Sequence, residues 1–313
     1  MKKNIRTLLI VLITTIAGFF LLTTPDIPLD DLKKRYMNET SAFMSINGMD
    51  VHYREEGAGQ PIVLIHGTAS SLHTWDAWTE KLKNRYRVIR FDLPAFGLTG
   101  PHPVRDYSMG AYANVLDQLL DKLEVDSAIL VGNSLGGKIA WRYAALHPVR
   151  VSKLVLLDAS GFPTEKGRPW IFGLARIPLL NSVISRITPR SIIKKNVEEV
   201  YFDNSKVSES LVDRYYDMAL REGNRQAFID RAQLDSKSKT HFLSKINCPT
   251  LILWGANDAW IPVSHAALFE KALPNAKTVI LENAGHVPME EVPQRSLVAL
   301  EDFLEAFNME KSK

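Results

Sequence analysis

The feature that most constrains the fold is a tight turn over residues 132–137, which have the sequence GNSLGG. It follows a short all-apolar run at 128–131 and opens a helical pattern at 135–146. A serine on such a strand-to-helix turn presents its hydroxyl, because the glycines leave room for a strained backbone and close packing. Free N–H groups at the start of the helix can also stabilise a developing oxyanion. The turn therefore predicts an α/β sheet with Ser134 as a candidate nucleophile.

The rest of the chain continues this strand–helix alternation, which is typical of an α/β sheet. The pair Asn47-Gly48 between the first two strand patterns predicts a hairpin. The expected strands are 42–46, 51–55, 61–65, 87–91, 128–131, 151–157, 250–254 and 277–281, and the expected helices are 72–82, 107–123, 135–146, 264–272 and 296–307.

One long interval, residues 162–242, has helical character and no strand pattern. Because it lies between two predicted strands, we expect it to be a helical cap inserted over one edge of the sheet. The core would then be formed by residues 42–161 and 243–313, with residues 25–41 as a linker.

A serine hydroxyl is a weak nucleophile and needs a base, which in turn needs an acid to hold its tautomer. Asp258 follows one predicted strand and His286 follows the next, so the chain order is Ser134, Asp258, His286. All three come at carboxyl ends of strands, where open α/β sheets collect their sites. Asp158, at the end of another strand, is the rival acid. The alternatives are a turn aspartate and a loop histidine without catalytic roles.

Two backbone N–H groups are the candidates for an oxyanion hole. One belongs to Leu135, which follows the nucleophile, and the other to Thr68, in the loop after the strand 61–65. Gly67 would allow close approach of a substrate. We interpret His66 as a structural residue that holds this loop rather than as a second base.

Taken together, these motifs resemble those of the α/β-hydrolase superfamily. The resemblance implies a mostly parallel, eight-stranded sheet with a helical cap and a Ser-Asp-His triad, with no metal or organic cofactor. Ala95 departs from the D-x-x-G-x-G pattern that is usual in the family, and Ser134 excludes the branches with aspartate at the elbow, namely haloalkane dehalogenases and epoxide hydrolases. The motifs are 66–67 (HG), 92–97 (DLPAFG), 132–137 (GNSLGG), 249–258 (PTLILWGAND) and 285–286 (GH).

Within the serine branches, esterases and lipases, including membrane-anchored monoacylglycerol lipases, are more similar to this chain than carbon–carbon bond hydrolases. The latter typically carry Trp after the catalytic histidine and a Gly-Pro-Gly loop, where this chain has Val287 and residues 68–70 (TAS). We therefore expect cleavage of carboxylic esters, with lipid-like or medium-chain acyl groups, through an acyl-enzyme. The alternatives are a carbon–carbon hydrolase, a perhydrolase and a non-catalytic binding module.

The cap carries the sequence information on substrate. Residues 166–196 contain seven basic residues and no acidic one, interspersed with apolar side chains. Such a segment suits a cap whose apolar face closes an acyl pocket and whose basic rim meets anionic lipid. The alternative is an ordinary lid with solvated basic residues.

The first 24 residues are set apart from this core. A basic start is followed by the uncharged run 7–22, long enough with the next two residues to span a bilayer. Residues 1–24 are therefore predicted to be an uncleaved membrane anchor, with a cleaved signal peptide or a buried helix as alternatives. Lys2, Lys3 and Arg6 would keep the N-terminus cytoplasmic and place the catalytic domain outside the cytoplasm.

Charge and cysteine content exclude other classes. The 38 Lys and Arg residues nearly balance the 35 Asp and Glu residues, so no nucleic-acid partner is expected. The single cysteine, Cys248, permits no disulfide within the chain. The expected partners are a small ester or lipid substrate and, through the N-terminal helix, a membrane.

Overall fold

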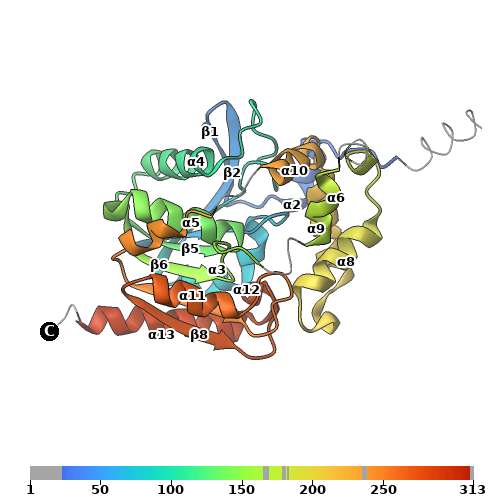
Figure 1. Cartoon of the computed structure of the whole chain (residues 1–313). Helices are drawn as coiled ribbons and strands as arrows, with labels where there is room; N and C mark the ends of the chain where they lie inside the picture. Colours follow the sequence, from blue (N-terminus) through green and yellow to red (C-terminus); the bar gives the residue numbers. More distant parts are fainter. Residues whose placement is uncertain (1–22, 165–168, 178–180, 182, 235–237, 311–313) are drawn as a thin grey trace, which may run out of the picture.

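The computed structural model describes residues 23–164, 169–177, 181, 183–234 and 238–310. Figure 1 shows a central sheet flanked by helices on both faces, with a further group of helices at one end. The strands are β1 (Ser41–Ile46), β2 (Met49–Glu56), β3 (Gln60–Ile65), β4 (Tyr86–Phe91), β5 (Ala128–Asn133), β6 (Val151–Leu157), β7 (Thr250–Gly255) and β8 (Ala276–Leu281). The helices are α2 (Leu29–Tyr36), α3 (Asp76–Leu82), α4 (Met109–Lys122), α5 (Leu135–Leu146), α6 (Trp170–Ala175), α8 (Arg190–Val200), α9 (Glu209–Leu220), α10 (Asn224–Gln233), α11 (Ser264–Ala272), α12 (Pro288–Glu291) and α13 (Pro293–Glu310), with 3-10 turns at Leu72–Trp75, Pro148–Arg150, Asn204–Lys206 and Thr240–Lys245.

The sheet has the order β1-β2-β4-β3-β5-β6-β7-β8. Strand β2 is antiparallel to β1 and β4, and every other neighbouring pair is parallel. The turn between β1 and β2 has positive φ at both Asn47 and Gly48, at 52° and 74°, as a two-residue hairpin requires. The predicted eight-stranded, mostly parallel sheet is confirmed.

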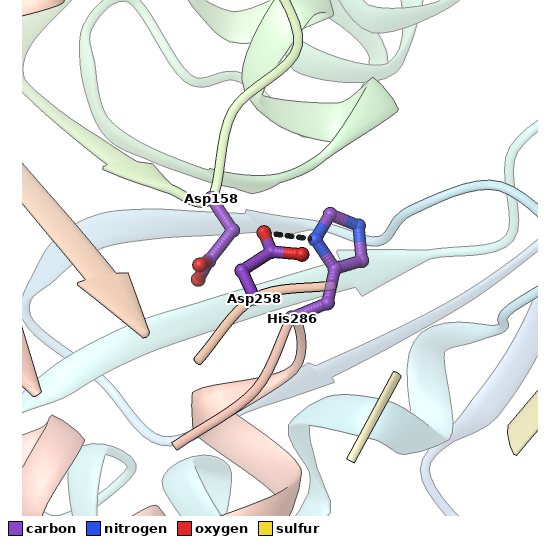
Figure 2. Close-up of side chains that lie close together, drawn as sticks. All are labelled: Asp158, Asp258 and His286. Atoms are coloured by element: carbon purple, nitrogen blue, oxygen red, sulfur yellow. Dashed lines mark hydrogen bonds and ion pairs between the residues drawn. The ribbon is translucent and has the colours of Figure 1, made fainter. Parts of the chain in front are cut away.

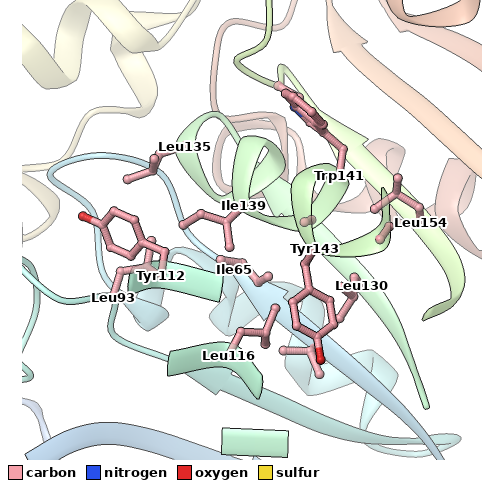
Figure 3. Packing of buried hydrophobic residues seen from close by; sticks show 14 of the residues in the cluster. Ile65, Leu93, Tyr112, Leu116, Leu130, Leu135, Ile139, Trp141, Tyr143 and Leu154 are labelled. Carbon is pink, nitrogen blue, oxygen red and sulfur yellow. The ribbon is translucent and has the colours of Figure 1, made fainter. Parts of the chain in front are cut away.

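Both faces of the central strands are buried, which explains their unbroken apolar runs. Successive residues of a strand point to opposite faces. In β3, Ile62 and Leu64 join the core that contains residues of α3 and α13, whereas Val63 and Ile65 join the core that contains residues of α4, α5 and α11. Figure 3 shows part of the core on the α4, α5 and α11 side, where Ile139 of α5 lies beside residues of the sheet.

Strand β3 marks the point where the strand order reverses. The chain leaves β3 for β4 on one side and later returns to β5 on the other. Open α/β sheets bind ligands at the carboxyl ends of the strands at such a point. Here the loop after β3 meets the turn after β5, and a Cβ built on Gly67 would lie 3.2 Å from Ser134 Cβ.

The helices α6, α8, α9 and α10 come between β6 and β7 in the chain and form the group at one end of the sheet in Figure 1. Arg190 of α8 pairs with Glu209 and Asp213 of α9 at 2.7 Å each, and Lys194 pairs with Glu209 at 2.7 Å. Two basic residues of the segment 166–196 are therefore engaged by acidic residues of the cap itself, which removes them from the predicted basic rim.

The N-terminal segment requires a correction. Across the residues that the structure describes, no helix has the length and apolar character needed to cross a bilayer. Residues 1–22 of the predicted anchor lie outside the described residues, and its last residue, Thr24, is not helical and donates from its N–H to Arg186 O in the cap at 2.7 Å. The prediction of a membrane-anchored chain with an extracytoplasmic domain is overturned on this finding.

Residues 25–41, predicted as a linker, contain the helix α2. Leu32 of α2 is fully buried against Leu98 and Met218. Ile27 also donates from its N–H to Leu220 O at 2.8 Å, at the end of α9. This segment thus packs against both the core and the cap.

Candidate active site

Ser134 occupies the turn between β5 and α5 with φ 52° and ψ −110°. An L-residue rarely adopts such a conformation, which costs on the order of 1–3 kcal/mol and persists only where the surroundings impose it. Here the Ser134 N–H donates to Leu157 O at 3.0 Å, and Ser134 O accepts from Ser160 N at 3.0 Å. The strained elbow predicted from the sequence is present. These two hydrogen bonds tie it to β6 and the residues after it, and Ser134 O also accepts from Lys138 N in α5 at 3.1 Å.

The glycines of the elbow permit close contacts between backbones. A Cβ on Gly136 would lie 2.0 Å from Ile65 O, and a Cβ on Gly132 would lie 2.3 Å from Gly136 O. No side chain fits at either position. The helix N-terminus is therefore held directly against the end of β3, beside the loop that contains Thr68.

His286 is hydrogen-bonded to Asp258, with 2.7 Å between His286 Nδ1 and Asp258 Oδ2 (Figure 2). The other oxygen, Asp258 Oδ1, accepts from Trp260 N at 2.7 Å and Ile261 N at 2.9 Å. Both side chains are buried. Because the carboxylate can only accept, Nδ1 carries the proton, which leaves Nε2 of the neutral imidazole as a proton acceptor.

The backbone of His286 is held from two sides. Its N–H donates to Val200 O at the end of α8, at 2.8 Å. Its carbonyl accepts from Asn133 Nδ2, beside Ser134, at 2.9 Å. The sequence reasoning missed this role of Asn133, although its place next to the elbow serine was the available signal.

Asp158, the rival acid, lies beside Asp258 but does not bond the histidine (Figure 2). Its Oδ1 accepts from Gly255 N at 2.9 Å. One donor atom from each of Asp158, Asp258 and His286 falls within 4.8 Å of the others, a set that zinc accepts as ligands. Both oxygens of Asp258 already accept hydrogen bonds from N–H groups, however. The three side chains are therefore arranged around hydrogen bonds to Asp258 rather than around a shared point where a metal would lie.

The loop after β3 is held by His66, as interpreted from the sequence. His66 Nδ1 lies 2.7 Å from Gly67 O, and His66 Nε2 accepts from Leu93 N at 2.9 Å. Burial lowers the pKa of His66, so the ring stays neutral. Both ring nitrogens are engaged, which leaves His66 no acceptor for a second proton transfer.

The two predicted oxyanion donors belong to the start of α5 and to the loop after β3. Leu135 is the first residue of α5, and Thr68 lines a cavity together with Ser134 and His286. Within the described ranges, neither backbone N–H donates a hydrogen bond. Both are thus available to an incoming oxygen.

The buried aspartate that begins the motif 92–97 shapes the loop after β4, a role that the sequence did not reveal. Asp92 accepts from Leu72 N at 2.7 Å and Leu98 N at 2.8 Å, and lies 2.7 Å from His52 Nδ1. Burial alone would raise the pKa of Asp92, but His52 holds it below its usual range. In the same loop, Ala95 has φ 84°, a conformation that favours the glycine usual at this position of the family.

Two consecutive glutamates in α12, Glu290 and Glu291, connect the cap to the core. Glu290 pairs with Arg214 of α9 and accepts from Tyr215 Oη at 2.7 Å. Glu291 accepts from Phe202 N at 3.0 Å and from Gly285 N, the residue before His286, at 2.7 Å. Sequence reasoning missed this pair, because only the fold brings α12 against the cap.

Replacing Glu290 with glutamine is expected to destabilise the protein by about 3 kcal/mol, because it leaves the largely buried Arg214 without its counter-charge. Thermal unfolding should show a Tm lower by about 6 °C. The matched control is Glu209→Gln, which changes the exposed pairs with Arg190 and Lys194 and should leave Tm nearly unchanged. Equal Tm values for the two variants would contradict this role of Glu290.

A cavity of about 160 Å³ lies between the cap and the core, and Ser134 and His286 both line it. Its wall is mainly apolar. Among the described residues that line it, Arg225 and His286 are the ones with an ionisable basic group, and none is acidic. The cap contributes apolar side chains that include Phe172, Ile187, Ile192, Ile193, Val197 and Phe228.

A strained serine elbow, followed in chain order by a bonded acid and histidine at strand ends, defines the hydrolases of the α/β fold. The family model described as alpha/beta hydrolase fold matches residues 60–293, most of the chain. The protein therefore belongs to the α/β-hydrolase family.

Relatives within this family differ in their reactions. The chain is 30% identical over 270 residues to a 2-hydroxy-6-oxononadienedioate/2-hydroxy-6-oxononatrienedioate hydrolase of Paraburkholderia phymatum, covering 81% of this chain and 90% of the relative. The crystal structure of a bacterial membrane phospholipase A has a TM-score of 0.74 at 27% identity, covering 98% and 99%. A putative lipase of Acinetobacter baumannii has a TM-score of 0.75 at 25% identity, covering 93% and 99%.

Proposed function

We propose that this hydrolase cleaves carboxylic esters through an acyl-enzyme intermediate. Ser134 Oγ attacks the ester carbonyl while His286 Nε2 takes its proton, and Asp258 stabilises the resulting imidazolium. The N–H groups of Leu135 and Thr68 hold the oxyanion of the tetrahedral intermediate. His286 then protonates the leaving alcohol, and water follows the same path to release the acid.

The observation that carries this proposal is the hydrogen bond between His286 and Asp258, at the wall of a cavity that Ser134 also lines. The bond orients the imidazole and leaves its Nε2 as the base that a serine hydroxyl needs. The strained turn at Ser134 and the two free N–H groups beside it supply the other parts of the reaction.

The character of the cavity favours an acyl ester over a dicarboxylate. A dienedioate, the substrate class named for the Paraburkholderia relative, carries two carboxylates, and burying them requires cationic partners. Arg225 is the candidate partner in the described lining. Its Nη2 binds Asp26 at 2.6 Å and Thr24 O at 2.8 Å, and its Nη1 is left without a hydrogen-bond partner among the described residues, so this one guanidinium, already paired with Asp26, would have to serve two carboxylates. The apolar wall suits a medium-chain or lipid-like acyl group, in keeping with the lipase and phospholipase neighbours.

Hydrolysis of p-nitrophenyl esters of increasing acyl length by the full chain tests this proposal. We expect kcat/KM to rise to a maximum at medium length and to be far higher than for a 2-hydroxy-6-oxodienedioate assayed in parallel. The second candidate, a carbon–carbon hydrolase, is favoured by the 30% identity to the Paraburkholderia relative. Cleavage of the dienedioate alone by the folded protein would favour the carbon–carbon hydrolase. Cleavage of neither substrate would favour a binding module.

A further inference from the structure

We propose that Asp158 is a positioning residue that stays protonated and donates a hydrogen bond to the carboxylate of Asp258. This inference rests on the proposed function, because it concerns how the acid beneath His286 is held. Neither the proposed reaction nor the hydrogen bonds described above use the second oxygen of Asp158.

The position of Asp158 is imposed by the backbone. It follows the last residue of β6, with φ 46°, and its N–H donates to Leu253 O in β7 at 3.1 Å. The side chain is fully buried. Oδ1 accepts from Gly255 N, whereas no N–H or O–H group of the described residues donates to Oδ2. Figure 2 shows the carboxyl group beside that of Asp258.

Two adjacent buried carboxyl groups cannot both be ionised, so one of them holds a proton. Asp258 accepts three N–H groups, from Trp260, Ile261 and His286, and therefore keeps the charge. Asp158 accepts one, from Gly255. A proton on Oδ2 of Asp158 also removes the orphaned acceptor, since that oxygen becomes a donor toward Asp258.

The electrostatic surroundings agree with this placement of the proton. Burial raises the pKa of Asp158 well above its usual value, and the charge of Asp258 raises it further. The negative charge of Glu291 on α12 raises this pKa as well. A neutral Asp158 thus gives Asp258 a fourth hydrogen bond without placing a second negative charge beside the histidine.

This arrangement predicts different effects for two substitutions. In Asp158→Asn the amide oxygen can still accept from Gly255 and the NH₂ group can donate to Asp258, so kcat should stay within about threefold of the original. In Asp158→Ala the donor is lost, and kcat should fall about 10- to 100-fold, by analogy with the loss of an outer hydrogen bond that orients a metal-ligating residue. KM should be unchanged in both, because Asp158 does not line the cavity.

Steady-state kinetics on the preferred p-nitrophenyl ester, with fluorophosphonate titration of active sites, test this prediction in the full chain. Rescue by asparagine and a fall confined to kcat would not follow from a purely structural role. If asparagine were as damaging as alanine, Asp158 would have to act as an anion and the proposal would be wrong. An alanine variant with full kcat would also overturn it.

Infrared spectroscopy tests the proton directly and does not depend on the alanine variant folding or on ester hydrolysis. A protonated carboxyl group has a carbonyl stretch that an ionised carboxylate lacks. We expect this band at neutral pH in the original protein and its loss in Asp158→Asn. The absence of a band that depends on Asp158 would overturn the proposal, whereas a failure of ester cleavage with the band present would overturn only the proposed function.

Discussion

Replacing Ser134 with alanine is expected to lower kcat for ester hydrolysis by about 10⁶-fold, the loss found when the nucleophile of a triad is removed. The hydroxyl forms the covalent intermediate, and no other group in the cavity can replace it with the same geometry. The backbone should not change, because alanine has no more bulk than serine at this φ. The measurement is kcat on the preferred p-nitrophenyl ester, together with labelling by a fluorophosphonate, which should disappear.

The matched control is Ser70→Ala. Ser70 lines the same cavity but lies outside the elbow, with its hydroxyl 3.4 Å from Tyr215 Oη. This variant should keep its labelling and most of its activity. Labelling that persists in Ser134→Ala and disappears in Ser70→Ala would move the nucleophile to the loop after β3.

Replacing Asp258 with asparagine is expected to lower kcat by about 10⁴-fold while the fold is retained. The amide can donate to His286 Nδ1, which then accepts, and the ring proton moves to Nε2. In that tautomer the imidazole cannot take the proton of Ser134. The measurement is kcat as a function of pH. The loss near neutral pH should come from the wrong tautomer of His286, and the variant should remain folded.

The control for this substitution is Asp213→Asn, which changes an exposed carboxylate paired with Arg190 in the cap. Its kcat should equal that of the original protein. Should Asp258→Asn retain activity while Asp158→Asn loses it, the acid of the triad would be Asp158, the alternative that the sequence left open.

Much of the local structure could be predicted from the sequence. The strand expected at 151–157 is β6 at Val151–Leu157, with the same bounds. The strand expected at 128–131 is β5 at Ala128–Asn133, which continues two residues further. The helix expected at 135–146 is α5 at Leu135–Leu146. Apolar runs, helical periodicity and turn glycines act over a few residues, so they can be read without knowledge of the rest of the fold.

The N-terminal segment shows where such patterns fail. Hydropathy over residues 1–24 predicted a membrane anchor, and residues 25–41, between this segment and the first expected strand, were predicted to be a linker. Instead, Thr24 is hydrogen-bonded to the cap and α2 buries Leu32 between the core and the cap. Leu29, Leu32 and Tyr36 do recur at helical spacing, but a helix of eight residues is too short to be stable alone, and its stability comes from the surfaces that it contacts.

The sequence by itself determined the α/β class, the strained elbow at Ser134, and the order of serine, acid and histidine along the chain. Only the tertiary structure decided that His286 bonds Asp258 rather than Asp158, and that Glu290 and Glu291 connect α12 to the cap. Turn and strand signals depend on neighbouring residues, whereas these contacts join residues far apart in the chain. Their distances are set by how β6, β7 and the cap pack together, which no local pattern encodes.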